Sequence, residues 1–139
     1  NDVLIRTNAQ QVDNLDELLE KSDFISLHCP GGTENKHLIS SKQFKKMKNT
    51  AILINTARGE VVDDEALISA LRENQIAAVG LDVFNDEPNI NPGLLKFQNA
   101  ILLPHLGSAT QETREAMGFR VLDNIADFFE GKVPRDRVA

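Results

Sequence analysis

Five short apolar runs, separated by segments with helical patterns, constrain the fold of this chain more than any other feature. Each run is continuous, whereas a strand with one exposed face alternates apolar and polar residues. Continuous runs are typical of strands that are buried on both faces of a parallel sheet. The runs are residues 3–5, 24–27, 51–54, 77–81 and 100–103. We therefore expect an α/β fold built from right-handed strand–helix–strand units.

Polar residues with helix-capping chemistry precede each of the predicted helices between the apolar runs. A capping box pairs a first polar residue with Glu or Gln three positions later, and acidic residues favour the positive end of a helix dipole. The predicted caps and helices are Asn14 with Glu17 before 15–21, Ser40 with Gln43 before 42–48, and Asp63 with Asp64 before 65–74.

A longer helix is predicted over residues 109–131, after the last apolar run. Ser108 with Gln111 can cap its start, and Gly131 is placed to end it. Four apolar residues recur on one of its faces: Met117, Val121, Ile125 and Phe128. Because no further strand follows, we expect this helix to leave the sheet and pack on something else.

Composition excludes several classes of protein. A chain of 139 residues is suited to one domain with a core, and its net charge of −6 argues against binding to a phosphate backbone. The single cysteine, Cys29, forms no CxxC motif, so we expect neither a disulfide nor a metal site. No apolar run approaches the length of a membrane span. We expect a cytoplasmic domain without nucleic-acid or membrane partners.

Polar clusters follow three of the predicted strands, where ligands bind in open α/β sheets. Residues 55–59 follow the third run, Asp82 and Glu87 follow the fourth, and His105 follows the fifth. Because parallel strands end at one edge of the sheet, these side chains should converge there.

This combination of side chains is suited to the reduction of a 2-oxo acid. Arg58 offers a guanidinium fork that can bind a carboxylate, and the imidazole of His105 can donate a proton. Taken singly, each residue has an ordinary alternative, since Arg58 could be a surface arginine and Glu87 a solvated loop acid. His28 and His37 are interpreted as structural or surface residues.

Four ordered blocks closely resemble the D-2-hydroxyacid dehydrogenase family over about residues 15–133. The blocks are SDFISLHCP, NTARGEVVDDEALISAL, GLDVFNDEP and LLPHLGSATQETREAM. Within the family, the later blocks are most similar to glyoxylate, hydroxypyruvate and 2-ketogluconate reductases, and less similar to phosphoglycerate, formate and D-lactate dehydrogenases.

The resemblance implies a role for each matching residue. Arg58 would bind the substrate carboxylate, Glu87 would pair with His105, and His105 would donate the proton in reduction. It also implies NAD or NADP as coenzyme, a small 2-oxo or 2-hydroxy acid as substrate, and a homodimer. The residues implied to contact the coenzyme are Cys29, Thr56, Ala57, Arg58, Asp82, His105, Leu106, Gly107 and Ser108.

The sequence departs from the family pattern in three places. No GxGxxG turn is present, and the first strand and the separate substrate-binding domain have no counterpart. We therefore expect residues 1–139 to form an incomplete NAD(P)-binding domain, a partial Rossmann-like doubly wound sheet with a long C-terminal helix. Gly31 stands where the family has a bulky residue and Asn35 where it commonly has Thr, which predicts a loop of different shape.

Two alternatives stay open at this stage. Residues 1–10 fit either a second strand of the nucleotide domain, with a leaning towards NADP, or a remnant of the substrate-binding domain. The chain itself fits either an oxidoreductase, or part of one, or a non-catalytic dehydrogenase-like module that binds a nucleotide or a protein.

Overall fold

The computed structural model describes residues 6–138, which fall into two compact units, each considered by itself. The first unit runs to Pro104 and the second begins at His105. The elements of the first unit are α2 (Leu15–Lys21), β1 (Phe24–Leu27), α3 (Ser41–Phe44), β2 (Ile52–Asn55), η1 (Gly59–Val61), α4 (Asp64–Arg72), β3 (Ala78–Leu81), η2 (Leu94–Lys96) and β4 (Ala100–Leu102). The second unit contains α5 (Gln111–Phe129).

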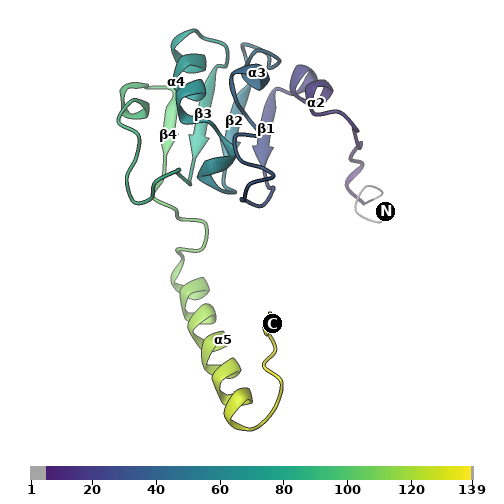
Figure 1. The fold of residues 1–139 in the computed structure, drawn as a ribbon, viewed down its shortest axis with the longest axis vertical. Coiled ribbons are helices and arrows are strands. Elements are labelled where there is room, and N and C mark those ends of the chain that lie inside the picture. The colour runs from purple at the N-terminus through teal and green to yellow at the C-terminus, as the bar shows by residue number, and fades with distance from the viewer. Residues whose placement is uncertain (1–5, 139) are drawn as a thin grey trace. The chain divides into compact units, whose positions relative to one another are not determined.

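The four strands form one parallel sheet in the order β1-β2-β3-β4 (Figure 1). The predicted α/β architecture with a parallel sheet is therefore confirmed. Leu27, Asn55, Leu81 and Leu102 are register partners at the ends of the strands. The segments that follow the strands consequently start at the same edge of the sheet.

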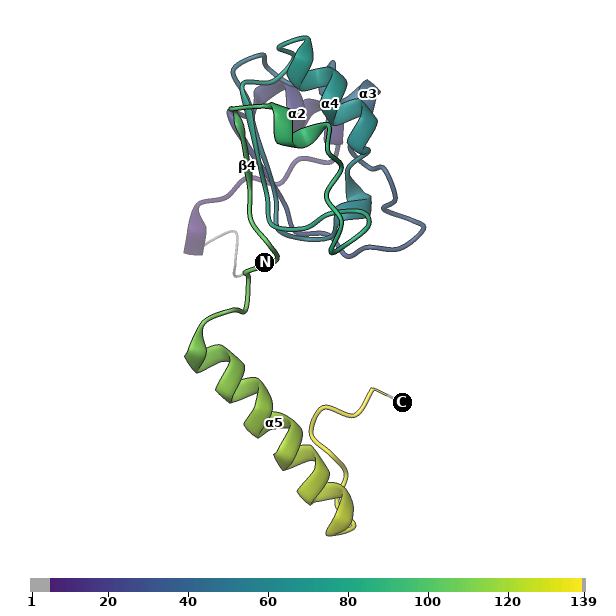
Figure 2. The ribbon, with the colours of Figure 1, turned by 90° about the vertical axis from the view of Figure 1, so that its left-hand side faces the viewer.

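Only one face of the sheet is packed within residues 6–104, which corrects the prediction that the strands are buried on both faces. Ile25, Leu53 and Val79 are buried, whereas Phe24 is 70% and Ile101 is 67% exposed. The physical reason is that right-handed crossovers between successive neighbouring strands place every connecting helix on the same side. Figure 2 shows α3 and α4 together on that side of the sheet.

The core lies between this packed face and the apolar sides of the helices. Leu53 and Val79 from the sheet meet Leu19 of α2, Phe44 of α3 and Leu67 of α4, and all five are almost completely buried. The apolar residues of α4 recur at helical spacing and face the sheet. The core extends to Leu27 and Leu81, the last residues of β1 and β3, so it packs against the edge of the sheet where the polar segments begin.

The predicted caps of the first two helices are partly correct. Asn14 caps α2 by accepting from the Asp16 amide at 2.9 Å, but Glu17 pairs with Lys21 at 2.7 Å, so the predicted capping box is not formed. Gln43 of α3 does accept from the backbone amide of Ser40, as predicted.

Both ends of α3 and of α4 differ from the predicted ranges 42–48 and 65–74, since α3 spans Ser41–Phe44 and α4 spans Asp64–Arg72. Helix α3 ends at Phe44 rather than residue 48, because the chain turns there towards β2. Helix α4 starts at Asp64, where the Asp63 side chain accepts from the amides of Glu65 and Ala66.

The second unit contains the predicted long helix, which spans Gln111–Phe129 rather than 109–131. Its cap is Thr110 rather than Ser108, because the Thr110 hydroxyl accepts from the Thr113 amide at 3.2 Å. Gly131 adopts a φ of 73° just beyond the end, as expected for a glycine that terminates a helix. The predicted apolar stripe is exposed, from 47% at Ile125 to 68% at Phe128. What it packs on stays a prediction.

The strand predicted at residues 3–5 lies outside the described residues. Arg6 and Thr7, which follow it, are helical. Over the described part of the chain, no helix combines the length and apolar character needed to cross a membrane.

Substitutions on opposite faces of the sheet test this packing. Leu53→Ala should reduce the free energy of unfolding by about 2–5 kcal/mol, because Leu53 is completely buried. Ile101→Ala should change it by no more than about 0.5 kcal/mol. Urea denaturation of both variants measures the difference. An equal decrease in the free energy of unfolding for the two variants would show that the second face of the sheet is also packed.

Candidate active site

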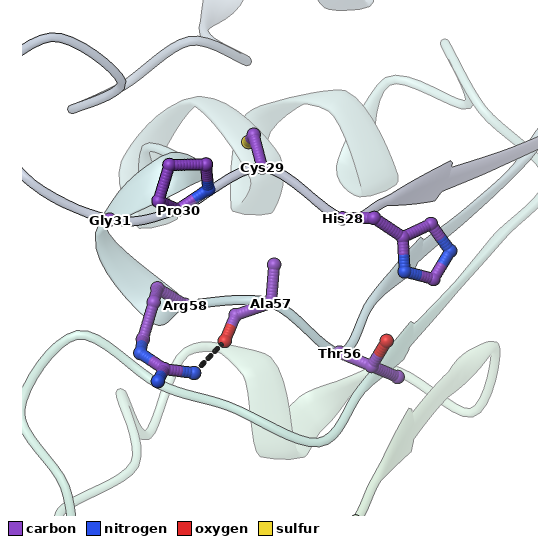
Figure 3. A pocket seen from close by; sticks show the side chains of 7 residues that line it. All are labelled: His28, Cys29, Pro30, Gly31, Thr56, Ala57 and Arg58. Atoms are coloured by element: carbon purple, nitrogen blue, oxygen red, sulfur yellow. Dashed lines mark hydrogen bonds between the residues drawn. The ribbon is translucent and has the colours of Figure 1, made fainter. Parts of the chain in front are cut away.

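Two segments at the carboxyl edge of the sheet line an open cavity of about 420 Å³. Residues 28–31 follow β1 and residues 56–58 follow β2, and Figure 3 shows them on opposite sides of the cavity. The cavity is of a size that binds small ligands. Of the predicted site residues, it brings together Cys29, Thr56, Ala57 and Arg58.

Asn55 shapes the second of these segments. It is the last residue of β2 and only 1% exposed. Its Nδ2 donates to the Arg58 carbonyl at 2.9 Å, and its Oδ1 accepts from the Ala57 amide at 3.1 Å. A buried amide that bonds to both sides of a turn fixes the path of the backbone. The prediction placed Asn55 in the cluster but gave it no role; a polar residue that ends an apolar strand was the available signal.

Arg58 leaves this turn in an extended conformation, with φ −144° and ψ 143°. The residue is exposed, and its Nη1 donates to the Ala57 carbonyl at 2.6 Å. That bond occupies one N–H of a group that has five. The guanidinium can therefore still bind a carboxylate through two parallel hydrogen bonds.

Gly59 allows the loop after β3 to lie directly against the Arg58 segment. A Cβ at position 59 would overlap the backbone of Phe84 and Asn85. The carboxylate of Glu87, on the same loop, accepts from the Phe84 amide at 2.9 Å. Gly59 thus positions the loop that carries Glu87 next to the loop that carries Arg58.

Asn85 fastens this loop to the start of α4. Its Nδ2 donates to the Val62 carbonyl at 3.2 Å and to Oδ1 of Asp64 at 2.7 Å. Burial raises the pKa of the Asp64 carboxyl above its usual value, and the hydrogen bond from Asn85 partly opposes that shift.

Asp82 follows β3 and is 7% exposed. Its backbone amide donates to the Asn55 carbonyl at 3.0 Å, so the sheet ladder continues one residue past the strands. The residue therefore lies at the predicted edge of the sheet, and its predicted contact with a coenzyme stays a prediction.

His105 is the first residue of the second unit. It lines a cavity of about 290 Å³ with Ser108, Ala109, Arg114 and Met117, and Leu106 and Gly107 lie between His105 and Ser108 in the chain. His105 has a φ of 55°, a conformation that non-glycine residues seldom adopt away from functional sites and tight turns. Its predicted pairing with Glu87 stays a prediction, because the two residues belong to different units.

A family model that matches most of the chain identifies its family. Residues 2–107 match the model of the D-isomer specific 2-hydroxyacid dehydrogenase NAD-binding domain. The chain belongs to the D-isomer specific 2-hydroxyacid dehydrogenase family.

The chain is similar to a glyoxylate reductase from Thermococcus litoralis, with 52% identity over 130 residues. That match covers 94% of the chain but 39% of the relative. The chain therefore spans about two fifths of the length of the curated relatives that it matches.

Solved structures of the family are also similar. An NADPH-dependent glyoxylate/hydroxypyruvate reductase from Sinorhizobium meliloti, in complex with NADP and malonate, matches with a TM-score of 0.79 and 38% identity, covering 83% of this chain and 36% of that one. A D-lactate dehydrogenase with NAD⁺ from Lactobacillus jensenii matches with a TM-score of 0.82 and 35% identity, covering 91% and 42%. The predicted Rossmann-type fold is confirmed.

The contact at Gly59 predicts that the chain tolerates no side chain at this position. Gly59→Ala should reduce the free energy of unfolding by about 1–3 kcal/mol or more, since the Cβ would meet backbone that cannot move aside. Gly80→Ala is the matched control in the same unit, because a Cβ there meets open space, and it should be neutral or stabilising. Chemical denaturation measures both. A tolerated Gly59→Ala would contradict the loop contact.

The raised pKa of Asp64 predicts that Asp64→Asn increases the free energy of unfolding by an amount that depends on pH. The folded protein binds the Asp64 proton more tightly than the unfolded chain, so the charged carboxylate disfavours folding at neutral pH. That cost disappears as the pH falls through the folded-state pKa. The variant should therefore gain stability over the wild type at neutral pH, with a smaller gain in acid. Denaturation at several pH values tests this, and a constant difference would contradict it.

Proposed function

We propose that this chain carries the catalytic residues of an NAD(P)-dependent D-2-hydroxyacid dehydrogenase that reduces a small 2-oxo acid, such as glyoxylate or hydroxypyruvate. The observation that supports this most is the cavity between residues 28–31 and 56–58, with Arg58 on its wall. The names of the Thermococcus and Sinorhizobium proteins support the substrate class. Because those proteins are much longer, we propose that the chain acts within a larger dehydrogenase as an incomplete NAD(P)-binding domain.

Substrate binding is assigned to Arg58. Its guanidinium would hold the carboxylate of the 2-oxo acid through two N–H donors and place the adjacent carbonyl near the strand ends. The Asn55 bonds to Ala57 and Arg58 hold this turn in position before substrate arrives. The positive charge would also stabilise negative charge that develops on the carbonyl oxygen.

Proton transfer is assigned to His105. The imidazolium would donate its proton to the carbonyl oxygen as that oxygen becomes a hydroxyl, and the neutral imidazole would take the proton back in the oxidation direction. Glu87 would bind the opposite ring nitrogen and hold the imidazole in orientation. Gly59 and Asn85 already anchor the loop that carries Glu87.

The residues around the cavity fit the nicotinamide end of a coenzyme. Thr56, Ala57 and Arg58 offer backbone groups at the strand ends, Cys29 lies on the opposite wall, and we assign Asp82, which follows β3, to the carboxamide. We assign residues 105–108 to the same ligand. When bound, a reduced nicotinamide coenzyme supplies the hydride. The coenzyme is proposed to be NAD or NADP, since solved structures with each of the two match.

We also propose a homodimer in the cytoplasm as the working form of the enzyme. The family resemblance supports the dimer, and the exposed apolar side chains of α5 are consistent with an interface. Light scattering coupled to size-exclusion chromatography tests the oligomeric state.

A chimera provides the direct test of the activity. Replacing the matching 130 residues of the Thermococcus litoralis glyoxylate reductase with this chain supplies the remaining parts of a dehydrogenase. A folded chimera should oxidise NADH or NADPH when glyoxylate is added. If a folded chimera neither binds coenzyme nor turns over 2-oxo acids, the alternative of a non-catalytic binding module is favoured.

Point variants of the chimera separate the assigned roles. His105→Ala should lower kcat by a factor of about 10² to 10⁴, and the limb of the pH profile that reports the proton donor should disappear. Arg58→Ala should lower kcat/KM for glyoxylate about 10- to 100-fold, as expected for the loss of charged hydrogen bonds. Arg72→Ala, at the exposed end of α4, is the control and should change neither value. An Arg58→Ala effect confined to coenzyme affinity would contradict carboxylate binding.

A further inference from the structure

The loop of residues 30–37 is tied at two points to a single residue, Glu60. The Gly32 amide donates to Oε1 of Glu60 at 2.6 Å, and the His37 amide donates to the Glu60 carbonyl at 2.8 Å. Asn35 closes the loop internally, since its side chain donates to the Pro30 carbonyl at 2.9 Å. Glu60 therefore holds a loop that is already shaped by its own hydrogen bonds.

Gly31 lies where a side chain would displace the Glu60 carboxylate. A Cβ at position 31 would overlap Oε1 of Glu60 and would lie 3.1 Å from Cγ of Arg58. Gly31 therefore sits directly on the aliphatic part of Arg58, and both residues line the 420 Å³ cavity. The loop, the carboxylate and the arginine stem are packed as one group.

This group needs the long acidic side chain of Glu60 and also needs the absence of a side chain at Gly31. A carboxylate accepts a hydrogen bond from a backbone amide more strongly than a neutral acceptor does. The Cβ of a larger residue at position 31 would turn the flexible Glu60 side chain away from the Gly32 amide. The two residues should therefore act as one unit rather than independently.

We propose that Glu60 is a positioning residue that latches the 30–37 loop against Arg58, and that the bare backbone at Gly31 is what makes room for the latch. The pair sets the position of the cavity wall opposite residues 56–58, and through it the affinity for coenzyme. This effect on affinity rests on the proposed function. The hydrogen bonds that form the latch do not rest on the proposed function, because they are contacts within the first unit.

Hydrogen exchange of the Gly32 amide in the 139-residue chain tests the latch without any ligand. Glu60→Ala should speed exchange at Gly32 about 3- to 10-fold and shift its amide proton resonance upfield. Glu60→Gln keeps an acceptor at the same reach and should have an intermediate effect. Glu34→Gln removes the same charge from an exposed position of the loop and should have none. Unchanged Gly32 exchange in a folded Glu60→Ala variant would overturn the proposal.

A double-mutant cycle in the chimera tests the effect on the cavity. Glu60→Ala and Gly31→Ala should each raise the Kd of NADPH or NADH about 3- to 10-fold, because the competent loop position is less populated. The double variant should bind coenzyme no more weakly than the weaker-binding of the two single variants.

The outcomes of the two experiments are separable. Independent, additive effects on Kd, or an unchanged Kd in Glu60→Ala, would overturn the role of the pair in coenzyme affinity. A wild-type chimera that binds no coenzyme would refute the proposed function and with it that role. In that case Gly32 exchange still decides whether the latch exists.

Discussion

The parallel register of the four strands is the constraint on which the site depends. Leu27, Asn55, Leu81 and Leu102 are aligned across the sheet, so the chain leaves every strand at the same edge. The ladder continues through the amide of Asp82, which extends this alignment into the polar segments. Residues that are far apart in sequence therefore begin from neighbouring points, and short loops are enough to bring them together.

Two residues convert this alignment into a defined cavity. Asn55 uses a buried amide to hold the turn that carries Arg58, and Gly59 lets the Glu87 loop lie on that turn. Neither is expected to touch substrate. Their contribution is rigidity, since a group that binds a carboxylate must be held in place before the ligand arrives.

The strands and the helix starts could be predicted from the sequence because each depends on a local pattern of residues. Apolar runs located all four described strands, and the caps at Asn14, Ser40 and Asp63 marked helix starts. The predictions failed where several polar residues competed. Thr110 rather than Ser108 caps α5, and Glu17 pairs with Lys21 instead of closing a box. Spacing alone cannot rank such partners, because they differ only by small local energies.

The sequence by itself determined the family, the α/β class and which polar residues follow which strand, since motif order and apolar runs are properties of the chain. Tertiary structure alone decided that one face of the sheet is packed within residues 6–104, because the order of the strands sets where each crossover helix lies. It also decided that Glu60, Gly31 and Arg58 form one packed group. The hydrogen bond from Gly32 to Glu60 joins residues 28 positions apart, and the close packing at Gly31 depends on the absence of a Cβ; neither leaves a periodic signal in the sequence.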